Sequence, residues 1–157
     1  PQTPATLYLG TTRVHHSINR ALSWTAISPD LTDGPGAGNL VFHTITTLAV
    51  SPGDPQRLWA GTDDGNVSTT TSGGTAWQNV SAGLPDRWVT SVAAHPTLSE
   101  TAYVTVSGYR WGEPMANVFR TDDGGTTWIA RTGGLRPGSG KLGPRGLEPR
   151  LGGAQVR

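Results

Sequence analysis

An internal repeat constrains this chain more than any other feature of its sequence. Three similar segments, SINRALSW, TTSGGTAW and TDDGGTTW, place Trp24, Trp77 and Trp128 at intervals of 53 and 51 residues. A Val lies ten residues before each of these tryptophans and a Leu lies seven residues after it. Upstream, the run PATLYLGT matches PQRLWAGT at a shift of 51 residues. A period of this length indicates a repeat architecture, in which each unit buries its face against the next.

Each repeat is interpreted as a set of short strands separated by turns. The 22 Gly and 12 Pro residues interrupt the chain too often for long helices, and turn residues between apolar runs are typical of strands. Two repeats have four strands and the first has three, which gives roughly eleven strands and no helix. The expected strands of the second and third repeats are 44–51, 57–62, 66–71 and 76–80, then 88–95, 101–107, 116–121 and 127–131.

These units predict an all-β fold made of four-stranded antiparallel sheets. Sheets of this kind stack radially as the blades of a β-propeller, which closes with typically about 4–8 blades. The chain holds about 2.75 blades by this interpretation, so we expect a partial β-propeller that needs further blades or self-association. The expected blade region is 1–135, with a partial blade at 1–31 and blades at 44–84 and 88–135.

The charge distribution separates a mildly acidic body from a basic tail. Residues 1–135 carry seven basic and ten acidic groups, whereas residues 136–157 carry five basic groups and one acidic group. The tail is rich in Gly and Pro and has no apolar period, so it is predicted to be disordered. The alternative is a basic segment that binds an acidic partner. The body gives no electrostatic reason to expect nucleic acid or an anionic membrane.

Several other classes of function find no support in the sequence. The chain has no Cys, which excludes disulfides and zinc–thiolate sites. No apolar run is long enough for a transmembrane helix. His15 and His16 are neighbours on an expected strand and point to opposite faces, so they cannot chelate one metal together. We therefore predict no metal, no cofactor and no membrane insertion.

The third repeat carries a recognisable turn motif. The run TDDGGTTW, residues 121–128, matches S/T-x-D-x-G-x-T-W at every specified position. It resembles the Asp-box, or BNR, repeat of bacterial sialidases, of xyloglucan-cleaving glycoside hydrolases, of sortilin-type propellers and of photosystem assembly factors. Asp123 can accept backbone N–H groups across the turn, and Gly125 can adopt a positive φ. Thr121 and Thr127 can add side-chain hydrogen bonds, and Trp128 is expected to bury its ring between neighbouring sheets.

The other two copies of the motif are degraded. They keep Trp77 and Trp24, but Ser72 and Asn19 stand where the motif has Asp. Both residues can still make a weaker version of the turn hydrogen bond. Asp-boxes are structural turns in enzymes and in proteins without catalytic activity, so the resemblance specifies the fold rather than the function. We expect Asp123 to be structural.

The resemblance implies that ligands bind on the rim opposite the Asp-box turns. That rim carries the loops between second and third strands and the linkers between blades. The third repeat lengthens its loop to SGYRWGEPM, residues 107–115. Aromatic rings stack on sugars, while Arg and carboxylate groups bind hydroxyls, so the rim suits a carbohydrate. The alternative is that the aromatic residues cap blade contacts and the charges face water. The predicted ligand-binding residues are Arg87, Trp88, Tyr109, Arg110, Trp111 and Glu113.

Catalysis would need a pair of carboxylates, which in most glycosidases are about 5–9.5 Å apart. The candidates on the rim are Asp63, Asp64, Asp86 and Glu113. Adjacent carboxylates in D-D-G are also ordinary turn formers. A complete site would use blades outside this chain, so we do not expect this chain to catalyse a reaction alone.

The functional prediction is a non-catalytic segment, for binding or scaffolding, of a larger secreted Asp-box propeller protein. Its ligand is expected to be a glycan or a protein. The alternative is a scaffold fragment of a glycoside hydrolase, similar to a sialidase or a xyloglucanase. Eleven Arg against one Lys suggests a bacterial source, and the resemblance implies an extracellular or periplasmic location.

Overall fold

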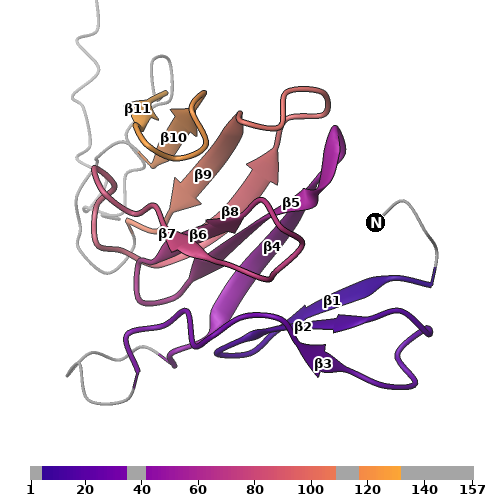
Figure 1. Ribbon diagram of the computed structural model, residues 1–157. Helices are drawn as coiled ribbons and strands as arrows, with labels where there is room; N and C mark the ends of the chain where they lie inside the picture. The colour runs from indigo at the N-terminus through magenta and orange to yellow at the C-terminus, as the bar shows by residue number, and fades with distance from the viewer. Residues whose placement is uncertain (1–4, 35–41, 109–116, 132–157) are drawn as a thin grey trace, which may run out of the picture.

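Three antiparallel β-sheets follow one another along the chain, as the computed structural model shows for residues 5–34, 42–108 and 117–131. These ranges contain eleven strands and no helix, which confirms the all-β prediction. In each sheet the strands pair with their neighbours in chain order. The first sheet comprises β1 (Leu7–Gly10), β2 (Val14–Ser17) and β3 (Thr25–Ala26), as Figure 1 shows.

The second and third sheets each have four strands, as the repeat predicts. The second comprises β4 (Ile45–Ser51), β5 (Asp54–Thr62), β6 (Val67–Thr70) and β7 (Gln78–Asn79). The third comprises β8 (Val89–Ala94), β9 (Ala102–Val106), β10 (Val118–Thr121) and β11 (Ile129–Ala130). The last strand of each sheet is only two residues long, which in the second and third sheets is shorter than the expected ranges 76–80 and 127–131.

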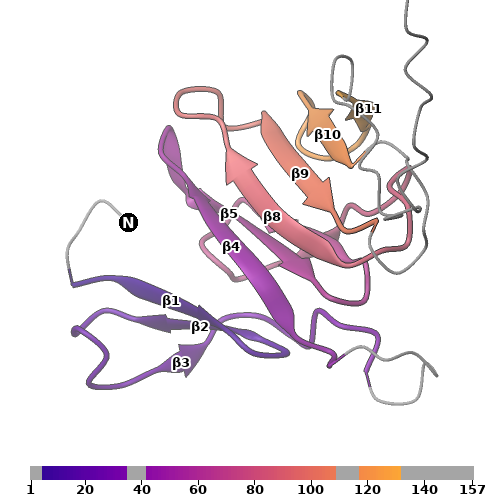
Figure 2. The same ribbon diagram turned by 180° about the vertical axis from the view of Figure 1, so that it is seen from behind.

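The sheets stack face to face, with β4 and β8 lying side by side at the inner end of the second and third sheets (Figures 1 and 2). Two apolar cores fill the two interfaces. Val14 and Ala60 belong to the core between the first and second sheets, whereas Trp59 and Val104 belong to the core between the second and third. Trp59 and Ala60 are consecutive residues of β5, so their side chains point to opposite faces of the sheet. The second sheet therefore contributes to both cores.

A Trp side chain joins each sheet to the one before it in the same way. The indole N–H of Trp77 donates to the carbonyl oxygen of Ile27 at 2.9 Å, and that of Trp128 donates to the carbonyl oxygen of Val80 at 2.7 Å. In both cases the acceptor lies three residues after the Trp of the preceding sheet. The ring of Trp128 also packs edge-on against Trp59, with 6.3 Å between centroids. We call this repeated contact the Trp latch.

The turn before Trp128 is held by one carboxylate and one hydroxyl group. Asp123 accepts hydrogen bonds from the hydroxyl of Thr121 at 2.8 Å and from the backbone N–H and hydroxyl of Thr127 at 2.9 and 2.6 Å. These donors, those of Thr127 first, lower the pKa of Asp123 from 3.8 to about 2, because they stabilise the charged form. The backbone N–H of Gly125 donates to the Thr121 hydroxyl at 2.9 Å. The turn therefore satisfies its own backbone donors.

The two earlier turns keep the same pattern with weaker groups. Ser72 accepts the N–H of Ala76 at 3.0 Å, and the side-chain oxygen of Asn19 accepts the N–H of Ser23 at 3.0 Å. Each bond spans the same four residues as the bond between Asp123 and Thr127. The repeat thus preserves the geometry of the turn although its chemistry changes from carboxylate to amide and hydroxyl.

Candidate functional site

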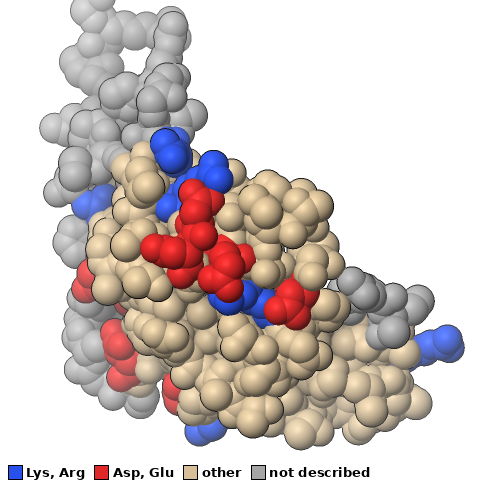
Figure 3. Space-filling model, turned by 45° about the horizontal axis from the view of Figure 1, so that its top comes forward, with Lys and Arg blue, Asp and Glu red and all other residues tan. Residues whose placement is uncertain are grey.

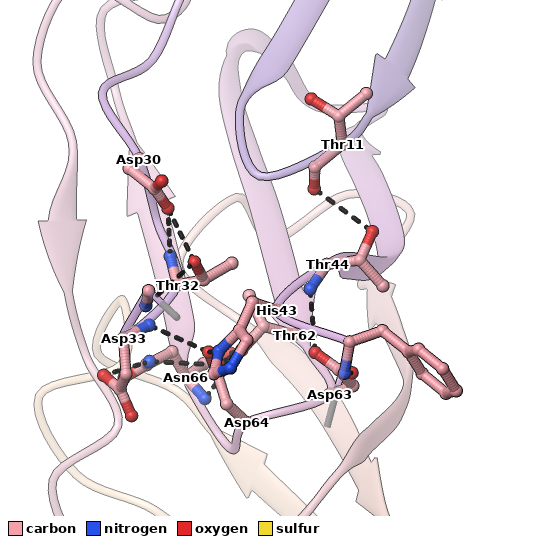
Figure 4. Close-up of polar contacts among 12 residues, drawn as sticks. Thr11, Asp30, Thr32, Asp33, His43, Thr44, Thr62, Asp63, Asp64 and Asn66 are labelled. Carbon is pink, nitrogen blue, oxygen red and sulfur yellow. Dashed lines mark hydrogen bonds and ion pairs between the residues drawn. The ribbon is translucent and has the colours of Figure 1, made fainter. Parts of the chain in front are cut away.

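Polar side chains converge at the rim of the second sheet, at the end opposite to the Trp-bearing turns (Figure 4). The backbone N–H of Asp33 donates to Asp64 at 2.8 Å, and the amide of Asn66 donates to Asp33 at 2.9 Å. The amide of Asn79 donates in turn to the side-chain oxygen of Asn66 at 2.9 Å. The β5–β6 loop thereby connects the segment before β4 with the end of β7. We define the rim network as Asp33, His43, Asp64, Asn66 and Asn79.

Asp63 holds the backbone of the segment that leads into β4. Its carboxylate accepts the N–H groups of Phe42 and of Thr44, the latter at 2.8 Å, and its own N–H donates to the carbonyl of Thr44 at 3.1 Å. Asp63 is only 1% exposed. Buried carboxylates persist where hydrogen bonds compensate for the loss of water, so this side chain is engaged in fixing the linker.

Asp64 is the acceptor at the centre of the rim network. Its side chain is 4% exposed. One oxygen accepts from the Thr62 hydroxyl and from the Asn66 amide at 3.1 Å. The other oxygen, besides accepting from Asp33, lies 3.5 Å from Nδ1 of His43. His43 has a φ of 53°, an uncommon conformation for a residue other than Gly. In this conformation the imidazole of His43 lies beside the carboxylate of Asp64.

Gly65 brings the next linker against the same loop. It has a φ of +90°, and a Cβ at this position would lie 2.7 Å from a carboxylate oxygen of Asp86 and 2.9 Å from the backbone nitrogen of Arg87. Only Gly permits both the left-handed backbone and this close approach. The linkers before β4 and before β8 therefore flank the β5–β6 loop, and Asp86 lies beside the rim network.

The structure describes five of the predicted site residues and brings four of them together. Asp63, Asp64, Asp86 and Arg87 lie in or beside the β5–β6 loop. Trp88 follows them at the start of the third sheet and is 37% exposed. The remaining predicted residues, Tyr109, Arg110, Trp111 and Glu113, lie outside the described residues.

The predicted site residues do not include four members of the rim network, Asp33, His43, Asn66 and Asn79, although the linkers between blades are predicted to lie on this rim. His43 is an isolated histidine in the sequence and the Asn residues stand in ordinary turns. The contact between Asn66 and Asn79 could have been predicted from the β6–β7 hairpin. Asn66 directly precedes β6 and Asn79 ends β7, and antiparallel pairing of these strands brings the two residues close together. The residues Asp33 and Asp64 are 31 positions apart in the sequence, so their contact cannot be predicted from a local sequence pattern.

The exposed groups of the site are polar and aromatic. Asp33, Asn79 and Asp86 are exposed, and Trp88 and Phe42 present aromatic surface nearby in the chain. Figure 3 shows the opposite end of the molecule, with the β8–β9 loop, where basic and acidic side chains lie next to one another. Within the described residues, no group of three or more His, Cys, Asp or Glu side chains is placed to hold a metal ion. The same ranges contain no helix that is long and apolar enough to cross a membrane.

Comparison with known proteins identifies the fold. The chain matches the GH74 enzyme of Niastella koreensis with a TM-score of 0.62 and 21% identity, over 83% of this chain and 21% of that one. It matches the GH74 xyloglucanase from Xanthomonas campestris with a TM-score of 0.59 and 21% identity, over 87% and 23% of the two chains. The chain folds as part of a β-propeller. Its first, second and third sheets are propeller blades.

A further propeller match is YCF48 bound to D1 peptide, with a TM-score of 0.55 and 14% identity, over 82% of this chain and 38% of that one. The sequence matches no family model and no curated protein. At these identities the structural likeness shows the propeller fold. The chain spans between about a fifth and two fifths of the matched propeller proteins.

Proposed function

We propose that this chain is a binding segment, without catalytic activity of its own, of a larger Asp-box propeller protein. The observation that carries the proposal is the convergence of two linkers and the β5–β6 loop on one rim, where carboxylate and amide groups form the rim network. Loops held by a rigid sheet scaffold are common positions for binding residues. The turn at residues 121–128, with its carboxylate-centred hydrogen bonds, supports assignment to the Asp-box family.

A glycan is the ligand that this chemistry favours. Sugar hydroxyl groups both donate and accept hydrogen bonds, so they pair with carboxylates and with amides. Asp33 and Asp86 supply exposed carboxylates and Asn79 supplies an exposed amide. Trp88 supplies an exposed aromatic ring of the kind that packs on the apolar face of a sugar. The same groups would also bind a polar peptide, which is the second ligand class we consider.

The burial and hydrogen bonding of the carboxylates favour a binding role over a catalytic one. A general acid or base must reach the proton that it transfers. Asp63 is buried and bonded to two backbone N–H groups, and Asp64 already accepts from three donors. Both therefore support the loop, whereas the exposed Asp86 contacts solvent. We infer an extracellular or periplasmic setting in a bacterial protein, in keeping with the family resemblance.

Titration calorimetry against a set of plant and bacterial oligosaccharides tests the proposal. Asn79→Ala and Trp88→Ala should each weaken binding by roughly tenfold, since each removes one contact worth about 1–1.5 kcal/mol. Trp24→Ala is the matched control, because Trp24 is exposed to 39%, much as Trp88 is to 37%, but lies on the first blade, away from the rim network. Trp24→Ala should leave binding unchanged, and binding that Asn79→Ala and Trp88→Ala also leave unchanged would refute the assignment to this rim.

The alternative function is a scaffold fragment of a glycoside hydrolase. The fold shared with GH74 enzymes favours testing it. Single substitutions of Asp63, Asp64, Asp86 and Glu113 to Asn or Gln in the full-length protein, followed by polysaccharide hydrolysis assays, separate the two proposals. A large loss of turnover in one variant that still binds glycan would support the hydrolase.

A further inference from the structure

Phe42 is an exposed aromatic residue on the rim of the second blade, beside the rim network. It is 76% exposed and lies in the linker that leads into β4, the inner strand of a blade that has a described blade on each side. The next residue, His43, instead lies beside the carboxylate of Asp64. One residue of this linker thus contacts the rim network while its neighbour presents an aromatic ring to solvent.

The backbone of Phe42 is held by a carboxylate that is withdrawn from water. Asp63 is only 1% exposed, and its two oxygens accept the N–H groups of Phe42 and Thr44, the residues on either side of His43. His43 has a φ of 53° between them, and Figure 4 shows the bond from Thr44 to Asp63. A carboxylate is costly to bury unless hydrogen bonds compensate. The carboxylate and the linker backbone therefore fix one another.

The third blade shows that this carboxylate is not needed merely to attach a linker. Strand pairing places Ser107 of the third blade at the position of Asp63, and Trp88 at that of Thr44. The N–H of Asp63 donates to the carbonyl of Thr44 at 3.1 Å, and the equivalent bond, from Ser107 to Trp88, measures 2.8 Å. This backbone bond attaches the linker in both blades. What the side chain of Asp63 adds is its hold on the backbone of Phe42.

The next linker presents a second exposed aromatic residue on the other side of the β5–β6 loop. Trp88 is 37% exposed and directly precedes β8. Its linker meets the loop at Gly65, where a Cβ would lie 2.9 Å from the backbone nitrogen of Arg87, whereas the linker with Phe42 meets the loop at Asp63. The two linkers lead into the inner strands of stacked sheets, which lie about 10 Å apart. A single sugar ring is too short to reach both aromatic residues.

We propose that Phe42 is a ligand-contact residue positioned by Asp63, and that Phe42 and Trp88 bind different sugar units of one glycan chain lying across the β5–β6 loop. The inference rests on the proposed function and narrows its ligand from sugars in general to chains of several units. Each ring would cover the apolar face of one sugar. The exposed carboxylate of Asp86 and amide of Asn79 would bind hydroxyl groups of the same chain. Affinity should therefore depend on the length of the glycan.

Titration calorimetry of the complete 157-residue chain with cello-, xylo-, manno- and chito-oligosaccharides, each from the disaccharide upward, tests this dependence. In the series that binds, wild-type affinity should rise with chain length. Phe42→Ala should weaken binding of the long chains by roughly five- to tenfold and leave that of the disaccharide nearly unchanged. Phe42→Tyr keeps the ring and should keep the affinity. Leu98→Ala is the matched control, because Leu98 is an apolar residue exposed to 53% in the β8–β9 loop at the opposite end of the blades.

A double-mutant cycle tests the positioning role of Asp63. Asp63→Asn leaves only one acceptor for the two N–H groups, so it should weaken binding of the long chains in the wild-type background but not in Phe42→Ala, because its effect on affinity runs through Phe42. Equal effects in both backgrounds would overturn that role. Binding that Trp88→Ala weakens and Phe42→Ala does not would overturn this inference and leave the proposed function standing. A wild-type chain that binds none of the oligosaccharides would overturn both.

Discussion

Removal of the Trp128 side chain should destabilise the chain far more than removal of an equally large but uncovered Trp. Trp128 packs into the core between the second and third blades, edge-on against Trp59, and its N–H donates to the carbonyl of Val80. Trp24 has the same place in the repeat but is 39% exposed, since no described blade precedes it. The two residues thus form a matched pair that differs chiefly in the presence of a neighbouring blade.

The structure sets the expected size of the difference. Truncation of a core aromatic residue to Ala costs about 3–5 kcal/mol. Because Trp128 is only partly buried, we expect the lower part of this range. Of that loss, the hydrogen bond to Val80 accounts for about 1 kcal/mol and the edge-on contact with Trp59 for about 0.5–1.5 kcal/mol. Trp24→Ala removes neither contact, so its cost should stay below about 1 kcal/mol.

Chemical denaturation in urea measures both free energies. For a chain of this size, a loss of 3 kcal/mol corresponds to a fall in Tm of roughly 6–12 °C. Trp128→Phe should retain much of the ring contact and lose the hydrogen bond, so its cost should be intermediate. Asp123→Ala should also cost less than Trp128→Ala, because it removes turn contacts at the surface. Equal losses for Trp128→Ala and Trp24→Ala would refute the placement of the Trp latch at the blade interface.

Three further outcomes are expected. Gly125→Ala and Gly83→Ala both place a side chain at positive φ, +95° and +85°, but only at Gly125 would the Cβ lie 2.8 Å from Val80; the former should cost at least about 1 kcal/mol more in urea denaturation. The pKa of Asp123 is depressed to about 2, so its contribution to stability is present above its ordinary pKa of 3.8 and is lost as pH falls toward 2; Asp123→Asn should flatten thermal stability against pH in this window. Asp63→Ala leaves two linker N–H groups without their acceptor and should cost about 1–3 kcal/mol; an unchanged unfolding free energy would contradict that role.

Much of the fold could be predicted from the sequence because one set of contacts recurs. The period fixes which residues face the next blade, and the Trp at the end of each turn marks the start of each last strand. Strand ends were less predictable. β5 begins at Asp54, three residues before its expected start, because it extends its pairing with β4 past a register shift at Val50–Ser51. Such irregularities depend on both strands together rather than on either sequence alone.

The candidate site was only partly predictable, for a related reason. The run D-D-G-N marks a loop with carboxylates, and the repeat places it on the rim. Its partners Asp33 and His43 reach it from a linker whose path depends on the two N–H groups held by Asp63. His43 itself has a positive φ, which is uncommon for a residue other than Gly and is not announced by the sequence around it. The linker is not part of the repeat, so its contacts cannot be predicted from the period of the sequence.

The lengths of the rim loops indicate where function resides in this chain. The spacing across this loop is four residues in the first blade, from Gly10 to Val14. The equivalent spacing in the second blade, from Gly61 to Val67, is six residues. The two added residues belong to the D-D-G-N loop, which makes the rim network. In the third blade the same step, from Thr105 to Val118, is thirteen residues. The spacing from Val to the latch Trp stays at ten throughout. Insertions that accumulate on one rim while the packing positions keep their period are typical of a binding face on a repeat scaffold, and they support the proposal of a ligand site on the rim of the second and third blades.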